Sequence, residues 1–210
     1  MRLPRLLFIA LLLVCAIPVA GISGPDADLA RGEALFNTCA ACHGDQGQGD
    51  ALLLAPGIGG LSPWYVEAQI RKFQTGVRGA HPNDIAGLRM RPMSRLLRTD
   101  TDTKAVAAYI GTLPEPPTRV TLDGDAARGA PLYAPCIACH GIDGKGNPAL
   151  QAPSLHSSDW YQLTQLKNFK AGIRGRADDP FGVMMRPMAM MLVDEQAMKD
   201  VIAHVQTLGR

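Results

Sequence analysis

Apolar and polar positions alternate along the chain with the spacing of helices that bury one side. The segment 62–75 places its apolar side chains three or four residues apart: Val66, Ile70 and Phe73. Ser62 precedes it as an N-cap, Pro63 fits the first turn and Gly76 ends it. This segment is therefore predicted to be an amphipathic helix.

Five other segments show the same spacing, and we predict helices at 28–38, 101–112, 125–133, 158–170 and 194–208. Pro131 must lie near the start of its helix or distort it, because proline has no backbone N–H to donate. Stretches rich in glycine and proline separate the helices, and no run alternates for the length of a strand. The pattern predicts an all-α fold with long loops.

The second half of the chain repeats the first. The offset between matching residues is 97 at the first matches, such as Gly32 with Gly129, and falls to 95 near the end. Other matched segments are 39–43 with 136–140, 64–65 with 160–161, 76–79 with 172–175, and 90–93 with 185–188. So slow a drift indicates the duplication of one unit of roughly 85–90 residues.

The duplication divides the chain into two small domains of similar length, at 24–113 and 125–210. Between them, the segment 114–124 begins Pro-Glu-Pro-Pro and is expected to be a short, extended and fairly stiff linker. Domains of this size have little room for an apolar core of their own. We therefore expect a bound group to complete each core.

Residues 1–23 resemble an export signal. Two arginines precede an apolar run at 6–16, and small residues follow it, as in a secretory signal peptide. The run is short for a membrane anchor. We therefore expect cleavage and a periplasmic protein, with membrane association only through a partner or an uncleaved N-terminus. Cys15 lies in this run, but Val14 before it is a poor fit to a lipoprotein signal.

Composition narrows the class of protein. Apolar residues make up 47% of the chain and charged residues 19%, which excludes a disordered chain. Without Arg2 and Arg5 of the signal, basic and acidic residues are equal in number in each half. A nucleic-acid partner is not expected, since it would require a basic stripe. Steering by net charge must be weak, so recognition must depend on local patches.

Two identical motifs hold all four cysteines that follow the export signal. Each is C-x-x-C followed at once by histidine: Cys39, Cys42 and His43 in the first half, and Cys136, Cys139 and His140 in the second. This is the attachment signature of haem c, in which the thiols bond the porphyrin and the histidine binds iron. A zinc site or two disulfides would leave both histidines unexplained. We predict two covalently attached haems c.

The sixth iron ligand is predicted to be a methionine of the repeated Met-Arg-Pro-Met segment. The candidates are Met90 or Met93 in the first half and Met185 or Met188 in the second. A thioether is a soft, neutral ligand that raises the reduction potential of haem iron. The methionines that do not repeat are expected to fill gaps in the apolar core.

These motifs resemble those of the dihaem class I cytochromes c of the c-four type. The resemblance covers residues from about 28 to 210. It includes the two C-x-x-C-H motifs, an aromatic pair before a helix ending Phe-x-x-Gly-x-Arg-Gly, and then M-x-x-M-x-x-x-L. In that family the first methionine, seven residues before the leucine, is the axial ligand. The resemblance thus implies Met90, before Leu97, and Met185, before Leu192.

The resemblance also implies a fold and a role. The fold would be two cytochrome c domains facing one another across a pseudo-twofold axis. The role would be one-electron carriage, not catalysis, with a cytochrome bc complex, a terminal oxidase or a periplasmic dehydrogenase as partner. The Arg-Pro inside each methionine motif and the low net charge depart from the family pattern, and leave the partner open.

Two alternatives to a free carrier remain. One is a dihaem subunit of a larger membrane or periplasmic oxidoreductase, which uses the same chemistry. The other is a dihaem peroxidase, which would require one haem with an open or displaceable ligand and an acid–base residue beside it. The equivalent methionines in both repeats disfavour the peroxidase.

Several other repeated residues are candidates for haem contact. Arg78 and Arg174 could pair with haem propionates or lie on the surface. Trp64 and Trp160 could donate to propionates or pack on the haem edge. Pro56 and Pro153 are expected to support the proximal histidines through a backbone carbonyl.

Overall fold

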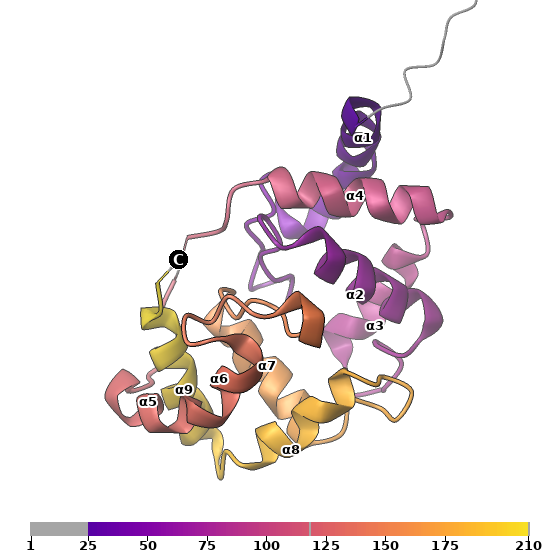
Figure 1. Ribbon diagram of the computed structural model, residues 1–210. Coiled ribbons are helices and arrows are strands. Elements are labelled where there is room, and N and C mark those ends of the chain that lie inside the picture. The colour runs from indigo at the N-terminus through magenta and orange to yellow at the C-terminus, as the bar shows by residue number, and fades with distance from the viewer. Residues whose placement is uncertain (1–24, 118, 210) are drawn as a thin grey trace, which may run out of the picture.

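The computed structural model describes residues 25–117 and 119–209; the predicted export signal at 1–23 lies outside them. Four helices form the first domain: α1 (Pro25–His43), α2 (Pro63–Thr75), α3 (Ile85–Ser94) and α4 (Asp100–Thr112). The second domain contains five α-helices: α5 (Ala126–Tyr133), α6 (Ile137–His140), α7 (Asp159–Lys170), α8 (Met185–Met190) and α9 (Glu195–Thr207). Its short 3₁₀ helices are η1 (Ala134–Cys136), η2 (Pro148–Leu150) and η3 (Gly182–Met184). Figure 1 shows the first domain above the second.

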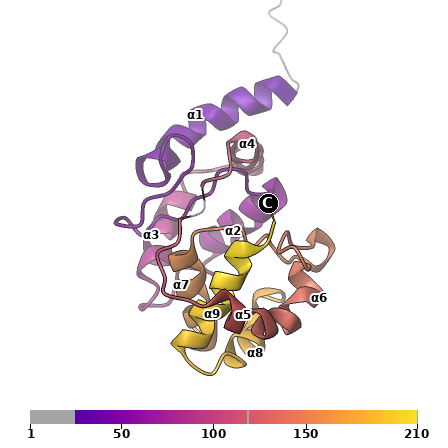
Figure 2. The same ribbon diagram turned by 90° about the vertical axis from the view of Figure 1, so that its left-hand side faces the viewer.

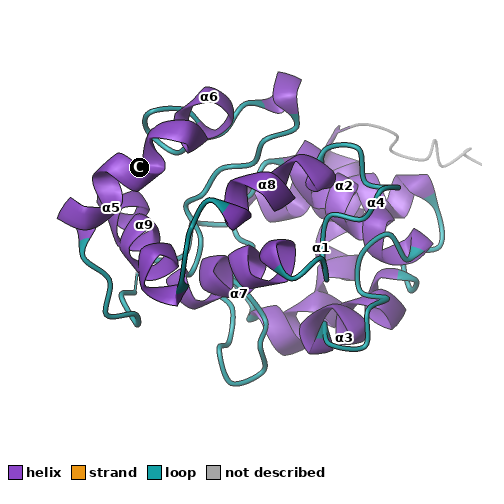
Figure 3. Cartoon of the chain, turned by 90° about the horizontal axis from the view of Figure 1, so that it is seen from below, coloured by secondary structure: helices purple, strands orange, loops and turns teal. Residues whose placement is uncertain are grey.

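Helices and loops account for the described residues, as Figure 3 shows, which confirms the predicted all-α class. Extended pairing within them is limited to the isolated bridges Asp50–Ala55 and Asn147–Ala152, at equivalent places in the two domains. None of the helices in these two ranges is long and apolar enough to span a bilayer.

Most predicted helices are observed with small changes at their ends. The helix α2 ends at Gly76, whose φ of 81° is left-handed and favours glycine. The helix α1 is longer than the predicted 28–38 because it continues through the first C-x-x-C-H motif. In the second domain, Pro131 and Pro135 interrupt the equivalent stretch, which becomes α5, η1 and α6.

The sequence pattern did not predict α3 and α8, which carry the repeated methionines. Each contains a proline that makes the segment read as a loop. Pro187 is the third residue of α8, where its missing N–H would have no partner within the helix. Pro92 lies only two residues before the end of α3, so little helix follows it.

Each domain has one apolar core, built where its first and last helices cross. In the first domain, α1, α2 and α4 bury a cluster that includes Phe36, Ile70 and Val106. In the second, α5 and α9 bury Tyr133 and Ile202 with their neighbours. Figure 2 shows α1 at the outer edge of the first domain, beside α4.

The crossings depend on two glycines at equivalent positions. A Cβ on Gly32 would lie 2.2 Å from the carbonyl oxygen of Ala105, and one on Gly129 would lie 1.9 Å from that of Asp200. Both contacts are with backbone atoms, which cannot rotate away. The helices can therefore approach this closely only where a side chain is absent.

Substitution of Gly32 by alanine is expected to force α1 and α4 apart and to destabilise the first domain by about 3 kcal/mol. The unfolding temperature should fall by roughly 10 °C or more, measured by thermal melting of the holoprotein. Gly209→Ala is the control, because no atom lies within 4 Å of a Cβ there. Equal melting temperatures for the two variants would show that the crossing tolerates a methyl group.

An acidic side chain also joins each pair of crossing helices. Arg31 Nε donates to Asp102 (2.8 Å), and Arg128 Nε donates to Asp200 (2.8 Å). The pKa of Asp200 lies below its ordinary value, chiefly because Arg128 binds the carboxylate. The pKa of Asp102 is also lowered, first by the hydrogen bond from Thr99 and then by that from Arg31.

A lowered carboxyl pKa gives stability that is present above the ordinary aspartate pKa of about 4 and is lost as the pH falls below it. Asp200→Asn should therefore melt below the wild type at pH 7. The difference should shrink as the pH falls from about 4. The exposed Asp45→Asn is the control; a difference for Asp200→Asn that is unchanged at low pH would contradict the assignment.

Candidate haem-binding sites

The histidine of each C-x-x-C-H motif is buried and held by a backbone carbonyl. His43 Nδ1 lies 2.7 Å from the carbonyl oxygen of Pro56, and His140 Nδ1 lies 2.9 Å from that of Pro153. Burial lowers the pKa of both imidazoles, and these hydrogen bonds only partly oppose it. With Nδ1 donating to the carbonyl, Nε2 of a neutral ring is left to bind a metal. The support predicted from Pro56 and Pro153 is present in the structure.

The cysteines lie beside these histidines, and none of the four forms a disulfide. Burial raises the pKa of Cys39 to about 11 and also raises that of Cys136. Within the described part of the chain, no group of three or more cysteine, histidine and acidic residues is placed to hold a metal ion. The disulfide and zinc alternatives therefore do not fit this arrangement.

A cavity in the second domain brings the motif together with the methionine helix. His140 and Cys136 line it together with Met185 and Met188 of α8. Buried apolar side chains also line it: Tyr133, Leu192, Val201, Ile202 and Val205. The empty space is ≈ 1060 Å³ when its open side is included. Its apolar lining, with histidine and methionine present, suits a large planar metal cofactor.

Burial distinguishes the two methionines in each repeat. Met90 and Met185 are half-buried, whereas Met93 is 39% exposed and Met188 is 36% exposed. An iron ligand must turn its sulfur inward, so burial favours the first methionine of each motif. Arg91 and Arg186, next to them, lie half-buried near Gly76 and Gly172.

Tyr133 supports the second motif from within the core. Burial raises the pKa of Tyr133 to about 12, so its hydroxyl keeps the proton at neutral pH. The hydroxyl donates to the carbonyl of Gly141, immediately after His140, at 2.7 Å. Phe36 is the equivalent residue of the first domain and has no hydroxyl, so this contact belongs to the second site alone.

Arg78 and Arg174 are buried between the two domains and do not lie on the surface. Each donates to the glutamine of its own domain and to that of the other: Arg78 to Gln69 (3.0 Å) and Gln165 (3.0 Å), and Arg174 to Gln165 (2.8 Å) and Gln69 (3.1 Å). Each guanidinium also stacks on a phenylalanine, Phe73 or Phe169, 4.6 Å from the ring centre. The reciprocal pairs give the interface an approximate twofold symmetry.

Each of the two buried arginines has a hydrogen-bond donor that is available to an acidic group. Nε of Arg78 and Nε of Arg174 are buried and find no hydrogen-bond partner among the described residues. An unpaired buried donor on a cation is costly, and a carboxylate is its natural partner. Arg174 lines the cavity of the second domain. The propionate groups of haem c therefore fit this position.

Two contacts break the approximate twofold symmetry of the interface, and the sequence motifs predict neither of them. Arg78 donates to the Tyr161 hydroxyl (2.7 Å). Burial raises the pKa of Tyr161, but the positive charges of Arg78 and Arg174 outweigh it, so the pKa lies below its usual value. Lys72 also crosses the interface to the buried Asp179, at 2.8 Å. In the repeat, Lys72 corresponds to Asn168, which has no charge to bind a carboxylate. This replacement is the only sign of the asymmetric ion pair in the sequence.

The remaining candidates lie close to where the sequence placed them. Trp64 and Trp160 are half-buried and pack edge-on against Tyr65 and Tyr161, and neither indole N–H donates to a described residue. On α9, His204 packs on Tyr133, with ring centres 5.5 Å apart.

Two helical domains, each with a buried histidine in a C-x-x-C-H motif and a half-buried methionine at the equivalent position, define a dihaem c-type cytochrome with two covalently attached haems c. The chain belongs to the cytochrome c family, whose model matches residues 29–114 and 126–209. Cytochrome c4 of Thiocapsa roseopersicina is 32% identical to it over 182 residues, which cover 80% of this chain and 87% of that protein.

The chain is also similar to an oxidase subunit and to a solved cytochrome structure. The cbb3-type cytochrome c oxidase subunit FixP of Bradyrhizobium sp. (strain ORS 278) is 32% identical over 189 residues. These residues cover 86% of this chain but only 61% of the subunit, so the chain spans about three fifths of that relative. The structure of reduced recombinant cytochrome c4 from Pseudomonas stutzeri matches with a TM-score of 0.70 at 24% identity, covering 86% of this chain and 98% of that one. This match supports the fold, and the c-four resemblance is confirmed.

Proposed function

We propose that this protein carries single electrons in the periplasm, between a respiratory donor and an acceptor such as a terminal oxidase. The donor would be a cytochrome bc complex or a periplasmic dehydrogenase. The observation that supports this most strongly is that His140 and Met185 line the same cavity. Domains at 24–113 and 125–210, the linker at 114–124 and a cleaved signal at 1–23 belong to the same proposal.

Each of the eight site residues has a proposed role in holding a haem. Cys39 and Cys42 hold the first haem, and Cys136 and Cys139 hold the second. His43 and Met90 bind the first iron, and His140 and Met185 bind the second. A haem at each site supplies reversible one-electron chemistry at iron.

The protein around each site favours electron transfer without binding of a substrate to the iron. The carbonyls of Pro56 and Pro153 fix the histidine rings, which holds one ligand in place in both redox states. With a methionine as the other ligand, no coordination position on the iron would be left for a substrate. We therefore expect a carrier and no enzymatic activity of its own.

The domain interface gives the carrier its internal connection. Arg78, Arg174 and their glutamines form a continuous hydrogen-bonded cluster between the two sites. The cluster fixes the relative placement of the domains. A fixed placement allows an electron that enters one domain to leave through the other.

A second candidate is the same dihaem module acting as a subunit of a larger oxidoreductase. The likeness to the FixP oxidase subunit over 86% of this chain favours it. A peroxidase has less support, because both sites carry a half-buried methionine at the equivalent position.

A potentiometric titration of the holoprotein tests the carrier function. We expect two reversible one-electron steps, full reoxidation, and no turnover of hydrogen peroxide. Peroxide turnover with a reduced cytochrome as donor would support the peroxidase and reject the carrier. Isolation in a stable complex with an oxidase would support the subunit.

A further inference from the structure

The two domains differ most clearly on the outer side of the helices that carry the methionines. In the first domain, the exposed residues of the segment 85–98 combine arginines with apolar side chains. We call six of them the α3 face; its members are Leu88, Arg89, Met93, Arg95, Leu96 and Arg98. All six are exposed, with Leu96 at 54%. The segment 85–98 contains four arginines and no acidic residue.

The second domain has lost the charge of this surface and kept its apolar part. At the repeat offset of 95, which also matches Met90 with Met185, each arginine of the α3 face corresponds to an apolar residue: Arg89 to Met184, Arg95 to Met190 and Arg98 to Val193. These three replacements are 58%, 60% and 80% exposed. Burial therefore does not explain the difference, since both sets of side chains meet solvent.

Within the described chain, the arginines of the α3 face bind backbone carbonyls at most. Arg89 donates to the carbonyl of Leu53 (3.0 Å), and Arg95 donates to that of Gln74 (3.3 Å). None of the three forms an ion pair with another described residue, although Asp100 is close in sequence and lines the same surface hollow as Arg95 and Arg98. Asp100 binds Arg71 instead, at 2.7 Å.

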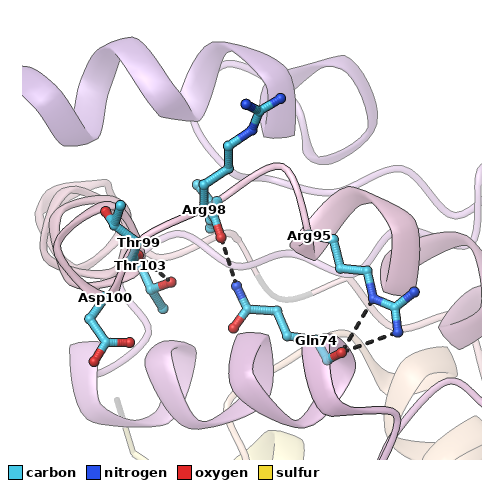
Figure 4. Close-up of a pocket in the computed structure, with 7 residues that line it drawn as sticks. Gln74, Arg95, Arg98, Thr99, Asp100 and Thr103 are labelled. Atoms are coloured by element: carbon cyan, nitrogen blue, oxygen red, sulfur yellow. Dashed lines mark hydrogen bonds between the residues drawn. The ribbon is translucent and has the colours of Figure 1, made fainter.

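Figure 4 shows this hollow at the edge of the α3 face. The guanidinium of Arg95 turns back to Gln74, while that of Arg98 points away from Gln74, Arg95 and Asp100. The face thus presents positive charge that the fold does not neutralise.

The α3 face also lies next to the first haem site. Met90 is half-buried on the same helix, and Arg89 reaches the loop that follows the first C-x-x-C-H motif. Three leucines of that loop are exposed: Leu52, Leu53 and Leu54. A protein seated here would contact the chain beside the first haem and not beside the second.

From these observations we infer that the α3 face docks an acidic redox protein, and that the equivalent face of the second domain does not. The inference rests on the proposed carrier function and adds the chemistry of one partner. Three guanidinium groups that form no ion pair with a described residue, set among exposed apolar side chains, complement a carboxylate-rich rim with an apolar centre. Because the chain has almost no net charge, attraction comes from this patch and is screened by salt. Electron exchange through the second domain should depend little on salt.

The test uses reduced flavodoxin, a small acidic one-electron donor, with the holoprotein in a stopped-flow instrument. For the wild type, the second-order rate constant should fall about tenfold between roughly 10 mM and 300 mM ionic strength. The triple variant Arg89→Met, Arg95→Met, Arg98→Val gives the first domain the residues of the second. It should lose about tenfold in rate at low ionic strength and most of the salt dependence.

A matched control removes the same charge elsewhere. Lys145→Met, Lys167→Met, Arg176→Met takes three exposed basic side chains from the second domain, outside α8. It should keep at least half of the wild-type rate. Equal rates for the α3-face triple and this control would overturn the inference.

Two further outcomes separate the inference from its alternatives. Binding of the wild type to vesicles of anionic lipid, but no salt-dependent reaction with flavodoxin, would make the face a membrane contact and overturn the acidic-protein assignment. If dithionite does not reduce both haems, the proposed carrier function fails. If it does, and the α3-face triple reacts with flavodoxin like the wild type, only the docking inference fails.

Discussion

Replacing Cys136 and Cys139 together by alanine is expected to leave one covalent haem per chain and to unfold the second domain first. The side chains that line the cavity, among them Tyr133 and Ile202, would then face an empty space. A hollow of this kind in a core costs roughly 3–5 kcal/mol. Haem content, measured by pyridine haemochrome and mass, should be half that of the wild type, and melting should separate into two transitions.

The matched variants show whether the loss is specific. Cys39→Ala with Cys42→Ala should remove the other haem and leave the second domain intact. Cys15→Ala, in the predicted signal, should leave two haems. Retention of both haems in either double variant would contradict covalent attachment at that motif.

Replacing Met185 by alanine is expected to keep both haems and to change the second one. Loss of a thioether ligand lowers the potential of that iron and opens a position for an added ligand. Half of the weak oxidised absorption at about 695 nm, which reports methionine–iron ligation, should disappear, and one haem per chain should bind carbon monoxide quickly. Optical spectra and a potentiometric titration of the variant measure both changes.

Met188→Ala is the matched control, because Met188 lies in the same helix and lines the same cavity. It should keep the full absorption at about 695 nm and the wild-type potentials. The pair Met90→Ala and Met93→Ala should behave in the same way in the first domain. Loss of the band in Met188→Ala, with its retention in Met185→Ala, would reverse the ligand assignment.

Much of this arrangement follows from local sequence signals. The N-caps Thr99, Asp125 and Asp194 and the left-handed Gly76 fix helix ends through short-range contacts. The helices α2, α4, α5 and α9 could therefore be predicted closely. The duplicated C-x-x-C-H motif places histidine against the carbonyl of Pro56 or Pro153 because the spacing between them is the same in both halves, 13 residues.

The remainder depends on contacts between distant segments. Helices α3 and α8 contain proline. A local sequence pattern treats proline as a helix breaker, although the surrounding fold accommodates it in these two helices. The burial of Arg78 and Arg174 arises only when the domains meet, since each arginine needs a glutamine from the other domain. Lys72 and Asp179 are 107 residues apart, and only the packed structure brings them together.

The most direct test of the account is the optical spectrum of protein matured in a periplasm, oxidised and reduced, with haem counted per chain. The account predicts two haems, a sharp reduced band at about 550 nm and a weak oxidised band at about 695 nm corresponding to two methionine-bound irons. A high-spin spectrum, or a missing band at about 695 nm with rapid binding of carbon monoxide by the unmodified protein, would contradict it. At least one iron would then be open to substrate, and the chain would be an enzyme or a sensor instead of a carrier.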